Sequence, residues 1–129
     1  MKPITAEWIE KAEGDFRTAG RESGSTDQPN YDAVCFHSQQ CAEKYVKAFL
    51  VEAETAFPKS HDLTRLLDLG LPIDSSLEEI RPELARLTDY AVEFRYPGQS
   101  ADRELAQHAL EDCRTVRARV RARLSLPQD

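Results

Sequence analysis

Apolar residues recur at spacings of three and four along most of this chain, and this period is typical of amphipathic α-helices. The first such stretch covers residues 5–22, with apolar positions at Trp8, Ile9, Ala12, Phe16 and Ala19. It ends at the run SGSTDQPN, whose glycine, proline and small polar residues indicate a loop. A second stretch begins at Asn30 or Tyr31 and extends to about Glu54. We therefore predict two long helices joined by a loop.

Three more helices are predicted in the second half of the chain. Ser60 can cap a short helix, and Ser76 begins a capping box at the start of a longer one. The FRYPG run, residues 94–98, ends the longer helix because proline and glycine favour a turn. Ser100 then caps a last helix that extends to about Leu124. No stretch shows the alternation that is typical of a β-strand.

The predicted fold is an all-α, antiparallel up-and-down bundle of four long helices plus one short connecting helix. A chain of 129 residues supports one core, so residues 1–129 are expected to form a single domain. No run approaches the roughly 18 apolar residues of a membrane span, and the opening MKPITAEWIEKAE lacks the apolar core of a secretory signal. We expect a cytoplasmic protein that does not contact a membrane.

Cysteine usage and charge exclude some kinds of chemistry. Cys35, Cys41 and Cys113 are odd in number and form no CxxC pair, so buried free thiols are predicted rather than disulfides or a zinc site. No metal and no cofactor are expected. The net charge of -6 disfavours indiscriminate polyanion binding, although five arginines gather without an acid in residues 113–124.

The second predicted helix carries a polar row opposite its apolar face. The members of the row follow one another at offsets of three, four and three, and they are His37, Gln40, Lys44 and Lys47. A solvated outer face is one explanation of such a row. Apolar Phe36 and Leu50 border it, however, and a mixed face of this kind is typical of a surface that meets a second subunit or a ligand.

Four short motifs resemble those of one protein family. QQCAEKYVKAFL, at residues 39–50, resembles the QQAAEKxxKAxL core of HEPN domains. SHDLTRLL at residues 60–67 is similar to the H-x-L segment of that family, and FRYPG is similar to its A-RYP segment. The opening motif W-x-x-x-A-x-x-D-F is formed by Trp8, Ala12, Asp15 and Phe16. In this order the motifs span nearly the whole chain.

The resemblance implies a small helical bundle that usually forms a homodimer. It also implies a minimal nucleotidyltransferase as partner, the pair acting as toxin and antitoxin. Several branches of the family are metal-independent RNases that use an arginine, four to six intervening residues and a histidine in the last long helix. Arg103 and His108 match this spacing here. Other branches have lost that chemistry and bind nucleotides or partner proteins.

The Arg103–His108 pair is open to a second interpretation. Five residues along a helix correspond to a rotation of about 140°, so the two side chains diverge within one chain. Leu110 stands where some RNase members carry a tyrosine. Arginine is also common in this chain, so the spacing can arise by chance. Catalysis by this pair is therefore an alternative and not the leading prediction.

Several other residues each have two possible roles. Arg95, followed by Tyr96 at a turn, can clamp a phosphate or bridge helix ends. His61 is expected to cap a helix or to form a buried hydrogen bond, and Glu43 is expected to pair with Lys47 one turn away. Arginines that flank the apolar stripe of the last helix can follow an RNA backbone or form ordinary surface salt bridges, and they are Arg103, Arg114, Arg117 and Arg121.

One main hypothesis and two alternatives follow. The chain is predicted to be a HEPN-domain component of a toxin-antitoxin or nucleotidyltransferase-associated system, which binds nucleotide or RNA through the polar row, Arg95 and Tyr96. The first alternative is a non-catalytic, protein-binding helical subunit in which the row belongs to an interface. The second is a metal-independent endoribonuclease that uses Arg103 and His108.

Overall fold

The computed structural model describes residues 1–128, and within this range it contains helices and no strand. The α-helices are α1 (Pro3–Ser23), α2 (Tyr31–Glu52), α3 (Leu63–Gly70), α4 (Arg81–Leu87) and α5 (Arg103–Arg123). Two 3-10 helices flank α4, and they are η1 (Ser75–Ile80) and η2 (Thr88–Ala91). The predicted all-α bundle is confirmed.

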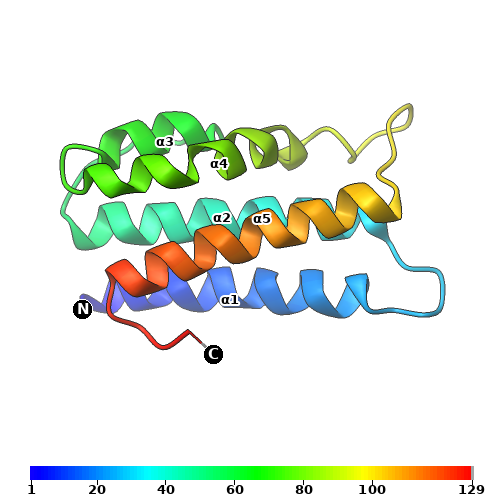
Figure 1. The fold of residues 1–129 in the computed structure, drawn as a ribbon, viewed down its shortest axis with the longest axis horizontal. Coiled ribbons are helices and arrows are strands. Elements are labelled where there is room, and N and C mark those ends of the chain that lie inside the picture. The colour runs from blue at the N-terminus through cyan, green and yellow to red at the C-terminus, as the bar shows by residue number, and fades with distance from the viewer. Residues whose placement is uncertain (129) are drawn as a thin grey trace.

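Helix α2 lies at the centre of the bundle. Figure 1 shows α1 antiparallel to α2 on one side, the α3 and α4 pair on the other side, and α5 crossing α2. Side chains of α2 therefore reach every layer, and Tyr45 and Leu50 are completely buried. The three cysteines are also buried and unpaired, as predicted. This central position explains why α2 is apolar over such a wide arc.

The predicted fourth long helix is instead a broken segment. Pro82 stands in the first turn of α4, where a residue without an amide hydrogen is tolerated, and the six residues before α4 form the tighter η1 turn. At the other end, the Thr88 hydroxyl donates to the carbonyl of Leu84 at 2.9 Å and accepts from the amide of Leu63 at 3.2 Å. The segment thus keeps the predicted place in the bundle but contains only seven α-helical residues.

Three of the predicted helix caps were wrong by two residues. The first amides of α3, η1 and α5 donate to aspartates, and not to the neighbouring serines at 60, 76 and 100, and these aspartates are Asp62, Asp74 and Asp102. Both residue types can cap a helix, but an ionised carboxylate also interacts favourably with the positive end of the helix dipole. The FRYPG turn is confirmed, since Gly98 has a φ of 107°, which favours glycine.

A buried polar cluster joins three helices inside the bundle. The Glu13 carboxylate of α1 accepts from the Tyr45 hydroxyl of α2 at 2.6 Å and from Arg117 Nε and Nη2 of α5 at 2.8 and 2.7 Å. Arg121 donates to the Tyr45 oxygen at 3.0 Å. Two of the predicted surface arginines are therefore internal, since Arg117 and Arg121 are each 8% exposed. Arg114 pairs with Glu111 on the exterior.

None of the helices formed by the described residues is long and apolar enough to cross a membrane.

Candidate functional site

The polar row of α2 faces α1 of the same chain. His37 Nδ1 lies 2.7 Å from Asp15 Oδ1, and Lys44 Nζ donates to Asp15 Oδ2 at 2.6 Å. Asp15 is nearly enclosed, with a side-chain exposure of 11%, whereas His37 and Lys44 keep 29% and 25%. The row consequently has an acidic partner, and that partner comes from α1.

Further along α2, a second carboxylate, that of Glu43, is buried among several hydrogen-bond donors. Lys47 Nζ and Gln39 Nε2 each donate to Glu43 at 3.0 Å, and Gln40 donates to Gln39 Oε1 at 2.7 Å. The predicted Glu43–Lys47 pair is thus confirmed. Lys47 also lies 5.8 Å from the ring centroids of two aromatic residues, which are Trp8 and Phe57.

The interpretation of the whole row as a surface for a second molecule does not hold for Lys47. This residue is 8% exposed, and its ammonium group is held by Glu43 and covered by aromatic rings. A ligand could reach it only after this buried pair had been broken, which is costly. Periodicity placed the row correctly on one side of α2, but it could not show that α1 packs there. His37, Gln40 and Lys44 remain partly exposed.

His61 does not cap α3, because Asp62 takes that position. Its Nδ1 instead lies 2.8 Å from Glu43 Oε1, while 65% of its side chain is exposed. Burial alone would raise the pKa of Glu43, but the hydrogen bonds from Gln39, His61 and Lys47 outweigh burial and hold that pKa below its ordinary value. Glu43 is therefore an ionised acceptor at neutral pH.

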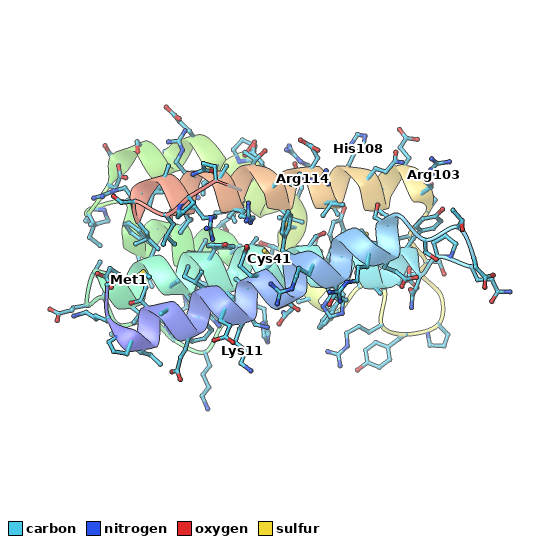
Figure 2. The ribbon with its side chains drawn as sticks, turned by 90° about the horizontal axis from the view of Figure 1, so that it is seen from below. Met1, Lys11, Cys41, Arg103, His108 and Arg114 are labelled. Carbon is cyan, nitrogen blue, oxygen red and sulfur yellow. The ribbon has the colours of Figure 1, made fainter. Side chains whose placement is uncertain are left out.

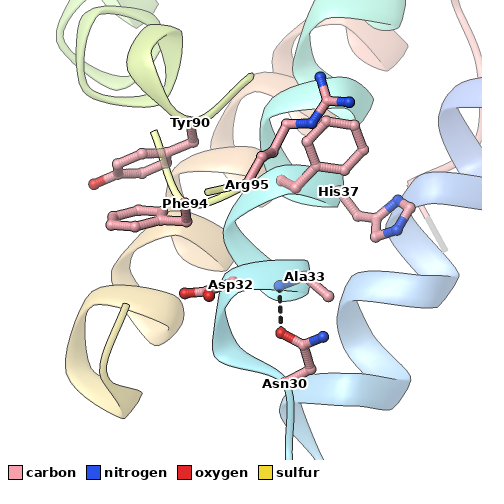
Figure 3. Close-up of a pocket in the computed structure, with 8 residues that line it drawn as sticks. Asn30, Asp32, Ala33, His37, Tyr90, Phe94 and Arg95 are labelled. Carbon is pink, nitrogen blue, oxygen red and sulfur yellow. Dashed lines mark hydrogen bonds between the residues drawn. The ribbon is translucent and has the colours of Figure 1, made fainter. Parts of the chain in front are cut away.

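A groove opens where the start of α2 meets the segment after η2 (Figure 3). Its volume is about 330 Å³, and its lining includes Asn30, Asp32, Ala33, Phe36, His37, Tyr90, Phe94 and Arg95. The Arg95 guanidinium carbon lies 5.7 Å from the centroid of the Phe36 ring. Across the groove, the rings of Tyr90 and Phe94 lie 5.4 Å apart at an angle of 36°.

The groove combines a cationic guanidinium with flat apolar rings. A guanidinium above an aromatic ring is held in place and presents its remaining donors to an anion. Asp32 holds the start of α2 against the residues before α5, because its Oδ1 accepts from the amide of Ala101 at 2.7 Å. An arginine, a histidine and aromatic side chains around one hollow form a set that can contact both the phosphate and the base of a nucleotide. Tyr96 is 66% exposed and does not line this groove.

Sequence reasoning identified two of the groove residues, Arg95 and His37, but not the others. Phe36 carried a signal, since it bordered the polar row as an apolar residue. Tyr90 carried none, and Phe94 was noted only as part of the FRYPG turn, because their packing beside α2 depends on how the broken fourth segment ends.

Arg103 and His108 both lie exposed on α5 (Figure 2). No hydrogen bond joins them in the part of the chain that the structure describes. His108 borders a hollow of about 310 Å³ together with Ser100, Asp102, Glu104 and Leu105, and Arg103 is not part of that lining. Two carboxylates in such a hollow repel a phosphodiester. The fold of one chain therefore does not bring the predicted pair together.

Within residues 1–128, no three histidine, cysteine, aspartate or glutamate side chains are grouped so that they could hold a metal ion.

Comparison with known proteins identifies the family and the fold. A family model described as the HEPN domain matches residues 5–123. The crystal structure of TT1696 from Thermus thermophilus is similar, with a TM-score of 0.73 and 24% sequence identity, over 94% of this chain and 98% of that chain. No match was found among curated proteins. At this level of identity, the likeness to the solved structure shows a shared fold.

Proposed function

Since this chain belongs to the HEPN domain family, we propose that it binds a nucleotide or a short single-stranded RNA in the groove between the start of α2 and Arg95. Family membership supports a nucleotide- or RNA-related helical protein. The observation that carries the finer proposal is the Arg95 guanidinium over the Phe36 ring, 5.7 Å from its centroid, in a hollow that His37, Tyr90 and Phe94 also line. The volume of about 330 Å³ falls at the small end of ligand sites, which suits part of a nucleotide.

In this proposal each kind of side chain has one task. Arg95 binds a phosphate through charge-assisted hydrogen bonds, and His37 adds a second polar contact. The Tyr90 and Phe94 rings offer apolar faces for a base, and stacking of this kind is worth about 1–3 kcal/mol per base. Asp32 can accept a hydrogen bond from a base or ribose donor.

The charged residues that line the two hollows favour this groove, and not the hollow beside His108, as the binding site of an anionic ligand. The lining of this groove includes the guanidinium of Arg95 and the carboxylate of Asp32, whose Oδ1 already accepts a backbone amide. The hollow beside His108 instead contains two carboxylates and no arginine. Cleavage of RNA by Arg103 and His108 would thus need a different arrangement, in which residues from another copy of the chain contribute.

Binding can be tested by titration calorimetry with ATP and with a short single-stranded RNA. We expect heat with at least one of them, and we expect Arg95→Gln to weaken binding about tenfold or more, because one charge-assisted contact is lost. Arg114→Gln is the matched control, since this exposed arginine lies on α5 and pairs with Glu111. Equal affinity for the two variants would contradict the proposal.

A protein-binding role is the second candidate, and one observation favours it. Val92 and Tyr96 are 56% and 66% exposed, and they lie on the same segment as Arg95. Exposed apolar groups beside a cation are typical of protein interfaces. The partner we propose is a minimal nucleotidyltransferase of a toxin-antitoxin pair, which binds a homodimer of this chain. If calorimetry gave no heat with either ligand while Tyr96→Ser abolished co-purification with that partner, the segment would be an interface.

A further inference from the structure

One histidine of this chain is both exposed and held by a buried acid. The side chain of His61 is 65% exposed, whereas that of Glu43, which lies 2.8 Å from its Nδ1, is only 5% exposed. This contact ties the segment before α3 to α2, and an amide or hydroxyl side chain could make the same contact. A histidine at this place leaves its second ring nitrogen, Nε2, toward solvent.

The buried acid determines which nitrogen carries the proton. Glu43 accepts from three donors and is ionised, so the ring atom that faces it has to be Nδ1–H. In this tautomer the lone pair of the His61 ring lies on Nε2, the nitrogen that Glu43 does not contact. A carboxylate that fixes the tautomer and the orientation of an imidazole is the arrangement found where histidine reacts or ligates through its other nitrogen.

The side chains around His61 indicate which electrophile would be favoured. Lys59 and Arg65 are exposed, and neither forms an ion pair in the described part of the chain. Asp62, which directly follows His61 in the chain, accepts from the Thr64 and Arg65 amides at the start of α3. Two cations within four residues of a nucleophilic nitrogen in the chain favour a group with dispersed negative charge, such as a phosphoryl group.

We infer that His61 is a phosphoryl acceptor site that reacts through Nε2 with a donor of the phosphoramidate or acyl phosphate class. The Nε2 lone pair attacks phosphorus and forms the N–P bond. The bond from phosphorus to the leaving group breaks, and its electron pair departs with ammonia or with a carboxylate. The proton on Nδ1 stays hydrogen-bonded to Glu43, whose charge offsets that of the phosphorylated ring. This site is separate from the proposed nucleotide groove.

The chain contains its own controls, since its three histidines differ in exposure and anchoring. His61 is exposed and anchored, His37 is anchored to Asp15 but only 29% exposed, and His108 is exposed without a carboxylate partner in the described residues. If exposure alone governs reactivity, His61 and His108 react alike. If the buried carboxylate matters, His61 reacts faster than both.

The test is incubation of the whole protein with potassium phosphoramidate, followed by peptide mapping and phosphorus NMR. We expect phosphorylation at His61 about tenfold faster than at His108, with the phosphoryl group on Nε2, because loss of an anchoring carboxylate typically costs a functional imidazole at least that factor. Glu43→Gln should bring the two rates together. His61→Asn keeps a donor for Glu43 and should abolish this product while the circular dichroism spectrum stays unchanged.

Other results would overturn the inference. These are equal rates at His61 and His108 in the wild type, or a product on Nδ1. A nitrogen-15 NMR spectrum of the unmodified protein gives an independent answer if Glu43→Gln does not fold. A neutral His61 with its proton on Nε2 would show that the tautomer is the opposite one, and the site would then be only a structural tether.

Discussion

The cluster that joins α1, α2 and α5 allows a quantitative prediction for Glu13→Gln. Arg117 donates twice to the Glu13 carboxylate, at 2.7 and 2.8 Å, and the Tyr45 hydroxyl donates a third time at 2.6 Å. Glutamine has nearly the same shape but no charge, and it turns one acceptor oxygen into a donor that faces the guanidinium. The Arg117 cation then loses this counter-ion at an 8% exposed position.

Removing one partner of a buried ion pair typically costs 3–5 kcal/mol. Because the Glu13 side chain is still 21% exposed, water offsets part of the loss, and we expect the low end, about 3 kcal/mol. For a chain of 129 residues this corresponds to a melting temperature lower by roughly 10 °C.

Urea denaturation followed by circular dichroism measures this difference directly. Glu111→Gln is the control, since its partner Arg114 lies at 3.2 Å on the surface and the two side chains are 72% and 52% exposed. We expect no measurable change for that variant, because exposed pairs contribute little. If Glu13→Gln cost no more than the control, the argument that the buried cluster holds the three helices together would be refuted.

The same cluster sets the sign of a pH effect. Burial would raise the pKa of Glu13, but hydrogen bonds from Arg117 and Tyr45 lower it below its ordinary value of 4.5. A carboxyl whose pKa is lowered by folding contributes stability above the unfolded value and loses it as the pH falls through the folded value. The stability gap between wild type and Glu13→Gln should accordingly be full at pH 7 and close as the pH falls below 4.5.

Three further predictions concern other contacts. Burial raises the pKa of Cys35 to about 12, so native protein should not react with a disulfide reagent at pH 8, whereas all three thiols should react in urea. Tyr45→Phe should lower the free energy of unfolding by about 2 kcal/mol in urea denaturation, since the buried Glu13 and Arg121 lose a shared hydroxyl. Gly98→Ala should cost about 1 kcal/mol in the same assay, because the φ of 107° strains any side chain.

The helices could be predicted because their signal is local. Apolar periodicity and loop residues placed α1, α2 and α5 within a few residues of their observed ends. The choice of cap was harder, because a serine and an aspartate two residues apart offer the same kind of acceptor. The breaking of the fourth helix depends on Pro82 and on how tightly the turn before it is wound, and a capping box does not report this.

The groove could be predicted only in part, because its two sides come from distant parts of the sequence. Phe36 and Arg95 are neighbours only when the segment after η2 folds back on the start of α2. Sequence could assign Arg95 a role in binding phosphate, but it could not supply the aromatic rings around it. In the same way, Glu43 and His61 were each given a structural role, and their direct contact lay beyond any local pattern.

One arrangement on α2 connects the two proposed sites. Two acids, Asp15 and Glu43, are each contacted by a lysine and by a histidine. The lysines supply the positive charge that burial of a carboxylate demands, so neither histidine has to be protonated for the fold to be stable. His37 in the groove and His61 at the surface thus each have an orientation fixed by a carboxylate at Nδ1. In each ring, the carboxylate does not contact Nε2.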